Sequence, residues 1–239
     1  MTENQNRILR LVMAGILLFA MFVVAREGTA YVYTMQEGNV QEEAKKQPFC
    51  VVIDAGHGGA DPGKVGINEA LEKDINLQIA QKLKLFLEAS DVKVVMTRTD
   101  ESGLYDEDAS NKKVQDMKRR LELIEGAGPD LVISIHQNSY HEESVSGAQV
   151  FYYTTSEKSR KLAEILQQQL SRLDGQNHRK EKGNDSYYLL KKTSRPIVIA
   201  ECGFLSNRKE AELLVTPLYQ EKLAFQIHMG IMKYLNMLY

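Results

Sequence analysis

The sequence carries no excess of basic charge, few cysteines and no internal repeat. Its 30 lysines and arginines are outweighed by 32 aspartates and glutamates, which gives a formal net charge of −2. A nucleic-acid-binding domain is expected to present a basic face, so this balance argues against nucleic acid as a partner. The remaining composition, 43% hydrophobic and 26% charged over 239 residues, is that of one globular domain with a short appendage.

The only two cysteines, Cys50 and Cys202, each stand inside an apolar run typical of a strand. In an exported protein such a pair could form a disulfide. We expect two buried free thiols instead, because both neighbourhoods are apolar.

One long apolar run lies near the amino end. Residues 11–25 are uncharged, and arginines flank them on both sides. The run is shorter than the ~20 residues of a typical membrane-spanning helix and long for a buried one. Basic residues ahead of it favour export of the chain on its carboxyl side. We expect an N-terminal signal-anchor or transmembrane segment over residues 1–25, retained because no Ala-x-Ala cleavage site comes directly after it, with cleavage as the alternative. The polar stretch 26–47 is interpreted as a linker.

From residue 48 onward, apolar runs alternate with helical periodicity. Helices are predicted over residues 74–89, 114–124, 162–173 and 217–238. Strands are predicted at Phe49–Asp54, Val92–Thr97, Leu131–Ile135, Gly147–Tyr153, Tyr187–Leu190 and Ile197–Glu201. This alternation predicts a single three-layer α/β domain over residues 48–239, with a mostly parallel or mixed sheet and helices on both faces.

Three of the predicted strands end in polar signatures that contain histidine or glutamate. The signatures are VVIDAGHGG (residues 51–59), LVISIHQN (131–138) and PIVIAECG (196–203). Side chains at the carboxyl ends of strands in an α/β sheet converge on one crevice, where ligands bind. The pattern therefore points to an enzyme.

His57 and His136 are the obvious nitrogen donors for a metal. Each follows a strand and stands among small residues that let a substrate approach. A hydrolytic zinc site needs about three protein ligands and one open position. The other histidines are interpreted as solvated or structural; they are His141, His178 and His228.

The third ligand is left open by spacing. The start of the first predicted helix offers Glu69, Glu72 and Asp74, and Asp54 and Asp61 are further candidates. An acid in a first helical turn is also explained by the helix dipole, so chemistry alone does not choose among them.

Glu201 closes a predicted buried strand. A glutamate there either pairs with a cation in the core or serves the site. In zinc hydrolysis, a carboxylate that is not a ligand takes a proton from water and passes it to the leaving amine. We interpret Glu201 as that group.

Four ordered motifs, IDAGHGG…DPG, EKDINL, SIHQNS and ECGFLSN, resemble those of the zinc-dependent N-acetylmuramoyl-L-alanine amidases of the amidase-3 family, over about residues 50–238. The resemblance implies Zn²⁺ on His57, Glu72 and His136, and a catalytic role for Glu201. It also implies a peptidoglycan substrate, cleaved at the amide between the lactyl group of N-acetylmuramic acid and L-alanine.

The chain departs from the family pattern at a few positions. Ala55 stands where proline is usual, Gln137 and Ser139 replace smaller residues, and Cys202 replaces an aliphatic residue. None of these changes removes a ligand or the catalytic acid; they bear on loop rigidity and substrate preference.

Other features resemble the sporulation amidases of this family: the short amino-terminal anchor without cell-wall-binding repeats, the insert Asp100–Lys118, and residues 146–149 before an aromatic strand. This implies removal of stem peptides from spore-cortex peptidoglycan before muramic δ-lactam formation. It implies an extracytoplasmic location, membrane-anchored or secreted, which includes the forespore intermembrane space. In clostridial relatives an activating lipoprotein partner is also implied.

Two other classes of protein are alternatives to the amidase. One is a peptidoglycan-binding module that has lost catalysis, and the other is a zinc carboxypeptidase or deacetylase with the same ligand types. The basic cluster His178-Arg179-Lys180 with Lys182 could meet substrate carboxylates or a partner, although a solvated loop is the simpler interpretation.

Overall fold

The computed structural model describes residues 12, 13, 15–24 and 48–238, and the chain divides into the units Met1–Gln47 and Pro48–Tyr239. In the first unit the described residues are helical and exposed. Within the described ranges no helix is long and apolar enough to cross a membrane. The predicted anchor over residues 1–25 extends beyond these ranges, and the predicted linker 26–47 lies outside them.

The second unit is built on a six-stranded mixed sheet in the order β2-β1-β3-β6-β4-β5. The four strands from β2 to β6 pair in parallel, whereas β4 runs antiparallel to β6 and parallel to β5. The predicted single α/β domain with a mixed sheet is confirmed. The strands are β1 (Cys50–Ala55), β2 (Lys93–Met96), β3 (Leu131–Asn138), β4 (Gln149–Tyr152), β5 (Lys182–Gly183) and β6 (Ile197–Phe204).

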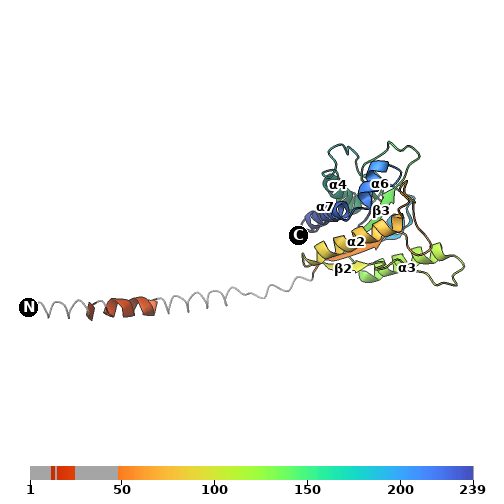
Figure 1. The fold of residues 1–239 in the computed structure, drawn as a ribbon. Coiled ribbons are helices and arrows are strands. Elements are labelled where there is room, and N and C mark those ends of the chain that lie inside the picture. Colours follow the sequence, from red (N-terminus) through yellow and green to blue (C-terminus); the bar gives the residue numbers. More distant parts are fainter. Residues whose placement is uncertain (1–11, 14, 25–47, 239) are drawn as a thin grey trace, which may run out of the picture. The chain divides into compact units, whose positions relative to one another are not determined.

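Helices cover both faces of the sheet, but unequally (Figure 1). On one face α2 and α4 both pack against α7, and on the other α3 contacts the short α5. A further helix, α6, follows β6. The helices are α2 (Glu72–Glu88), α3 (Lys112–Ala127), α4 (Glu157–Leu170), α5 (Tyr188–Lys192), α6 (Arg208–Leu214) and α7 (Pro217–Leu235).

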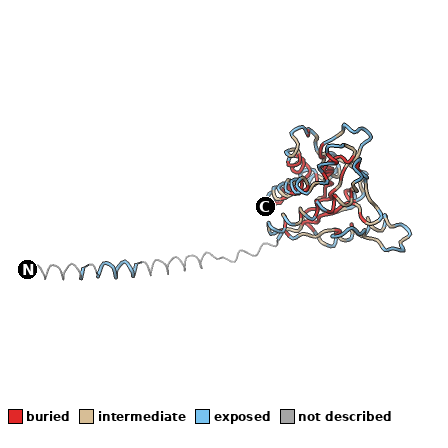
Figure 2. The backbone as a smooth tube through the Cα atoms, in the orientation of Figure 1, coloured by how far each residue is buried: buried red, intermediate tan, exposed pale blue. Residues whose placement is uncertain are grey.

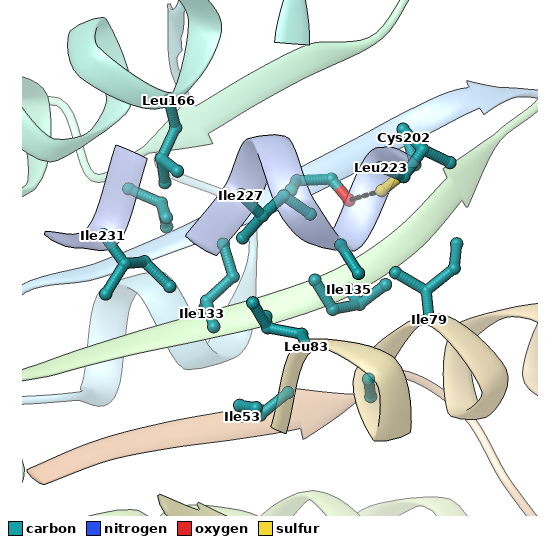
Figure 3. Packing of buried hydrophobic residues seen from close by; sticks show 14 of the residues in the cluster. Ile53, Ile79, Leu83, Ile133, Ile135, Leu166, Cys202, Leu223, Ile227 and Ile231 are labelled. Atoms are coloured by element: carbon teal, nitrogen blue, oxygen red, sulfur yellow. Dashed lines mark hydrogen bonds between the residues drawn. The ribbon is translucent and has the colours of Figure 1, made fainter. Parts of the chain in front are cut away.

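The larger core lies between the sheet and the layer of α2, α4 and α7. Figure 3 shows Ile53 and Ile133 of the sheet close to Leu83 of α2 and Ile227 of α7. All four side chains are fully buried, and buried segments follow the strands and the inner faces of these helices (Figure 2). Burial of apolar surface on this scale is the main stabilising term of such a fold.

The alternation of side chains along the strands directs His136 and Glu201 to the face of the sheet opposite the larger core. In β3, Ile133 packs in the larger core, whereas Val132 packs in the smaller core beneath α3 and α5. Successive side chains of a strand point to opposite faces. His136, four residues after Val132, and Glu201, two residues after Ile199 of the smaller core, therefore face the side of α3 and α5.

One predicted element is wrong, and two observed elements are not predicted. Tyr187–Leu190 is not a strand, because α5 occupies Tyr188–Lys192, and the sequence pattern predicts neither β5 nor α6. Short apolar runs do not distinguish strand from helix by periodicity. Both cysteines are free, as predicted, although Cys50 is only partly buried. The Cys202 thiol lies 3.6 Å from the Ala200 carbonyl oxygen (Figure 3).

Candidate active site

Three side chains that could bind a metal converge at the carboxyl end of the sheet. One ligand atom from each of His57, Glu72 and His136 lies within 4.8 Å of the other two. The His57 Nε2 atom is 3.2 Å from Glu72 Oε2, and the His136 Nδ1 atom is 2.9 Å from Glu72 Oε1. They come from the loop after β1, the first residue of α2, and β3.

Glu72 differs from the other acidic candidates in its position. It is 2% exposed, and its carboxylate accepts hydrogen bonds from the backbone amides of Lys64 (2.8 Å) and Gln137 (3.0 Å). Glu69 precedes the helix in an exposed turn with a φ of 64°, so the two glutamates do not share one helical face. Asp74, although on α2, is not part of the cluster.

In this cluster, the two imidazoles stabilise the charged form of Glu72, and Glu72 stabilises the charged form of His57. Burial alone would raise the pKa of Glu72, but hydrogen bonds and charge interactions with His136 and His57 hold it well below its usual range. The pKa of His57 is raised: the carboxylates of Glu72 and Asp61 outweigh the opposing effect of burial. Glu72 is therefore ionised near neutral pH and available as a ligand.

Asp61 is not in the cluster, but it orients one of its members. Its Oδ2 atom lies 3.0 Å from His57 Nδ1, so the Nε2 atom is the one that faces Glu72. A carboxylate on the outer nitrogen of a histidine fixes the tautomer and the ring orientation of a metal ligand.

Buried arginines hold the loop that carries His57. Arg120 donates hydrogen bonds to the carbonyl oxygens of Ala55 (2.8 Å) and His57 (2.5 Å), and Arg98 donates to that of Gly56 (3.0 Å). The φ of His57 is 63°, a left-handed conformation that is uncommon outside glycine. These contacts stabilise the loop in the conformation that places the imidazole.

Asp54, also considered as a ligand, is the counter-ion of Arg120. Its Oδ1 atom lies 2.7 Å from Arg120 Nη1, and the hydroxyls of Thr97 and Ser134 donate to the same carboxylate. Burial opposes ionisation, but the Arg120 charge and the Ser134 hydrogen bond lower the pKa of Asp54 to about 2.

Two glycines make room for the cluster. A Cβ atom on Gly56 would overlap the imidazole ring of His136. A Cβ atom on Gly63, whose φ is +69°, would stand 2.5 Å from Glu72 Oε2. Any side chain at either position would displace a ligand of the candidate site.

Glu201 stands beside the cluster, opposite His136 in the β3–β6 pairing. It is 6% exposed, and its pKa is raised mainly by burial and also by the charge of Glu72, against the opposing effect of His136 and His57. The Tyr187 hydroxyl donates to Oε1 at 3.4 Å. Among the residues that the structure describes, none hydrogen-bonds Oε2. No local pattern in the sequence points to Tyr187, because its contact with Glu201 is non-local.

These groups line a cavity of about 730 Å³. Residues 100–118 form part of its wall through Lys112, Lys113 and Asp116, and the start of α5 contributes Tyr188. An open, partly polar cavity of this size suits a substrate with several hydrogen-bonding groups.

Gln137 supports the site. Its side-chain amide donates to Asn76 Oδ1 (3.1 Å), and Asn76 in turn donates to Glu72 Oε1 (3.3 Å). Through Asn76, Gln137 therefore links β3 to the carboxylate of the cluster.

The remaining polar candidates lie elsewhere. His141 and His178 are exposed, and His228 lies 2.9 Å from the Ser90 hydroxyl. Of the basic cluster, Arg179 donates to the Ser146 carbonyl oxygen at 2.7 Å and covers the Phe204 ring. None of these residues lines the cavity.

The family model of the N-acetylmuramoyl-L-alanine amidases, amidase-3, matches residues 51–233. The chain belongs to this family. The germination-specific N-acetylmuramoyl-L-alanine amidase of Bacillus subtilis is 38% identical over 187 residues, which cover 77% of this chain and 78% of that protein. The resemblance found in the sequence motifs is confirmed, and the chain is an amidase.

Solved structures show the same fold. The CwlD amidase from Clostridioides difficile, in complex with the GerS lipoprotein, is 41% identical, with a TM-score of 0.77 over 79% of this chain and 99% of that one. The catalytic domain of the amidase CwlV from Bacillus (Paenibacillus) polymyxa is 30% identical, with a TM-score of 0.70 over 79% and 98%.

Proposed function

We propose that this amidase is zinc-dependent and cleaves the amide between N-acetylmuramic acid and L-alanine in spore-cortex peptidoglycan. The cleavage would precede muramic δ-lactam formation. The observation that carries the proposal is the convergence of His57, Glu72 and His136 beside the buried Glu201. The germination-specific relative and the likeness to CwlD support the choice of substrate.

The donor set fits zinc. Two imidazole nitrogens and one carboxylate form one of the usual ligand sets of catalytic zinc, which leave a fourth position open. The close approach of Gly63 to Glu72 and His57 leaves no space for a side chain there. When bound, zinc polarises a carbonyl group and lets water lose a proton near neutral pH.

Glu201 supplies the proton transfer. Its carboxylate takes a proton from the attacking water and passes it to the alanine nitrogen as the bond from the lactyl carbonyl carbon to that nitrogen breaks. Burial raises the pKa of Glu201, which brings a carboxyl group closer to the value that suits both steps.

The Glu201→Gln variant tests this role. Glutamine keeps the size of the side chain and removes the proton acceptor, so turnover should fall by about 10²–10⁴-fold while zinc content and thermal stability stay near those of the parent. Muropeptide products are followed by mass spectrometry. Near-normal cleavage by a zinc-loaded variant would place the base elsewhere.

The same digest separates the alternatives. An amidase releases peptides that begin with L-alanine. A carboxypeptidase shortens the stem peptide from its other end, a deacetylase changes only the sugar, and a binding module releases nothing.

We also propose an activating lipoprotein partner and attachment to the membrane through residues 1–25. The partner is suggested by the complex in which CwlD was solved. The attachment is suggested by the uncharged run at residues 11–25. Both would place the enzyme on the outer side of the membrane, next to its polymer substrate.

A further inference from the structure

We infer that Tyr187 is a positioning residue for Glu201: its hydroxyl holds one carboxylate oxygen, so that the other is presented as the proton acceptor. The inference rests on the proposed role of Glu201 as the general base.

The two oxygens of Glu201 have different surroundings. Oε1 accepts a hydrogen bond from the Tyr187 hydroxyl, whereas Oε2 is buried without a hydrogen-bond partner in the described part of the chain. A buried carboxylate oxygen left without a partner is costly. In an active site, such an oxygen is available to a group that arrives with the substrate, and here that group is the attacking water.

Tyr187 is itself held in place. Its backbone amide donates to Asn184 Oδ1 (3.0 Å), and its carbonyl accepts from the backbone amide of Lys191 (3.1 Å) in the first turn of α5. Its ring packs edge-on against Phe151 of β4, with a centroid distance of 5.7 Å. The hydroxyl therefore reaches Glu201 from a ring fixed by two elements.

The direction of this hydrogen bond is also fixed: Tyr187 donates and Glu201 accepts. Burial, and then the charge of Glu201, raise the pKa of Tyr187 to about 12. The phenol stays protonated at neutral pH, so it donates to the carboxylate. A donor on Oε1 favours the ionised form of Glu201, which burial opposes.

The first test compares Tyr187→Phe with the control Tyr140→Phe. The first variant removes the hydroxyl and keeps the ring that packs on Phe151. Tyr140 is exposed and does not line the cavity. For Tyr187→Phe we expect kcat to fall about 10-fold, the loss of one hydrogen bond to a charged group, with KM and zinc content unchanged. The control should keep its kcat.

A double-mutant cycle separates positioning from a structural role. If Tyr187 acts through Glu201, adding Tyr187→Phe to Glu201→Gln should cause little further loss in kcat. If the hydroxyl only stabilises the cavity wall, its 10-fold effect should appear in both backgrounds. Equal effects in the two backgrounds, or no effect of Tyr187→Phe on kcat, would overturn the inference.

A second readout does not depend on turnover. In metal-free protein labelled with ¹³C at tyrosine Cζ, the signal that disappears in Tyr187→Phe should shift when Glu201→Gln removes the neighbouring charge. An unchanged signal would mean that the two groups are not in contact. These experiments also separate the proposed role of Glu201 from the inferred role of Tyr187. An active Glu201→Gln variant refutes Glu201 as the general base. An inactive one beside a fully active Tyr187→Phe variant refutes positioning alone.

Discussion

Two residues of the candidate metal cluster, His57 and Glu72, are held by groups outside it. Asp61 fixes the ring of His57, and the backbone amides of Lys64 and Gln137 hold the Glu72 carboxylate. Metal sites depend on such outer contacts, and their loss typically costs about 10–100-fold in metal affinity or activity. The positions of His57 and Glu72 therefore depend on contacts outside the cluster.

The two nearby glutamates provide the sharpest residue-level prediction. Glu72→Gln removes an anionic ligand and should weaken zinc binding strongly, measured by competition with a chelator. Glu69→Gln, on an exposed turn outside the cluster, is the matched control and should be nearly silent. The reverse pattern would mean that the ligand assignment is wrong.

The sequence predicts the site only as far as local patterns reach. His57, His136 and Glu201 are visible because each ends an apolar run. Spacing alone leaves the third ligand open, and the family resemblance is what favours Glu72. The structure adds that α2 begins at Glu72 and that Glu69 lies before the helix. Tyr187 lies 14 positions from Glu201, and nothing in a linear pattern indicates that they meet.

At the level of elements, a buried ion pair joins β1 to α3. Asp54 and Arg120 are each about 1% exposed, and Arg120 also bonds to the loop that carries His57. Removing one partner of a buried pair typically costs about 3–5 kcal/mol, because the other charge remains buried. This pair therefore couples the fold to the geometry of the site.

Asp54→Asn should lower the free energy of unfolding by about 3 kcal/mol at neutral pH. The pKa of Asp54 falls from 3.8 to about 2 on folding. Its ionised form therefore stabilises the protein above about pH 4, by about 2 kcal/mol, and this contribution is lost as the pH falls toward 2. The difference between wild type and variant in urea unfolding should shrink over that window.

The matched control is Asp106→Asn, which removes an exposed carboxylate paired with Arg119, the neighbour of Arg120 on α3. Its unfolding free energy should stay close to that of the wild type, since exposed pairs contribute little. A difference between wild type and Asp54→Asn that is independent of pH would contradict the assignment of the low pKa.

Long elements are predicted from the sequence better than short ones. The run around Ile53 and the helical spacing of residues 74–89 both predict the observed elements to within a few residues. At Tyr187–Leu190, four residues fit a strand and a single helical turn equally well. The segment is helical in the structure, where Leu189 and Leu190 both pack in the smaller core. This tertiary contact cannot be seen in the local sequence pattern.

For the whole molecule, the proposed partner predicts weak zinc binding by the enzyme alone. The donors come from three separate elements, and metal affinity is coupled to the ordering of its ligands. We expect the purified protein to contain little zinc and to cleave slowly, and a lipoprotein partner to raise both. Zinc per chain is measured by elemental analysis. Full occupancy and activity without a partner would argue against this dependence.

The central claim is that one zinc ion on His57, Glu72 and His136 serves the cleavage of the muramoyl–L-alanine amide. The most direct measurement is a digest of peptidoglycan by the enzyme with its partner, after removal of metal and again after zinc is restored. We predict no product without metal, and peptides that begin with L-alanine once zinc is added. Undiminished cleavage by the metal-free enzyme, or cleavage at any other bond, would contradict the claim.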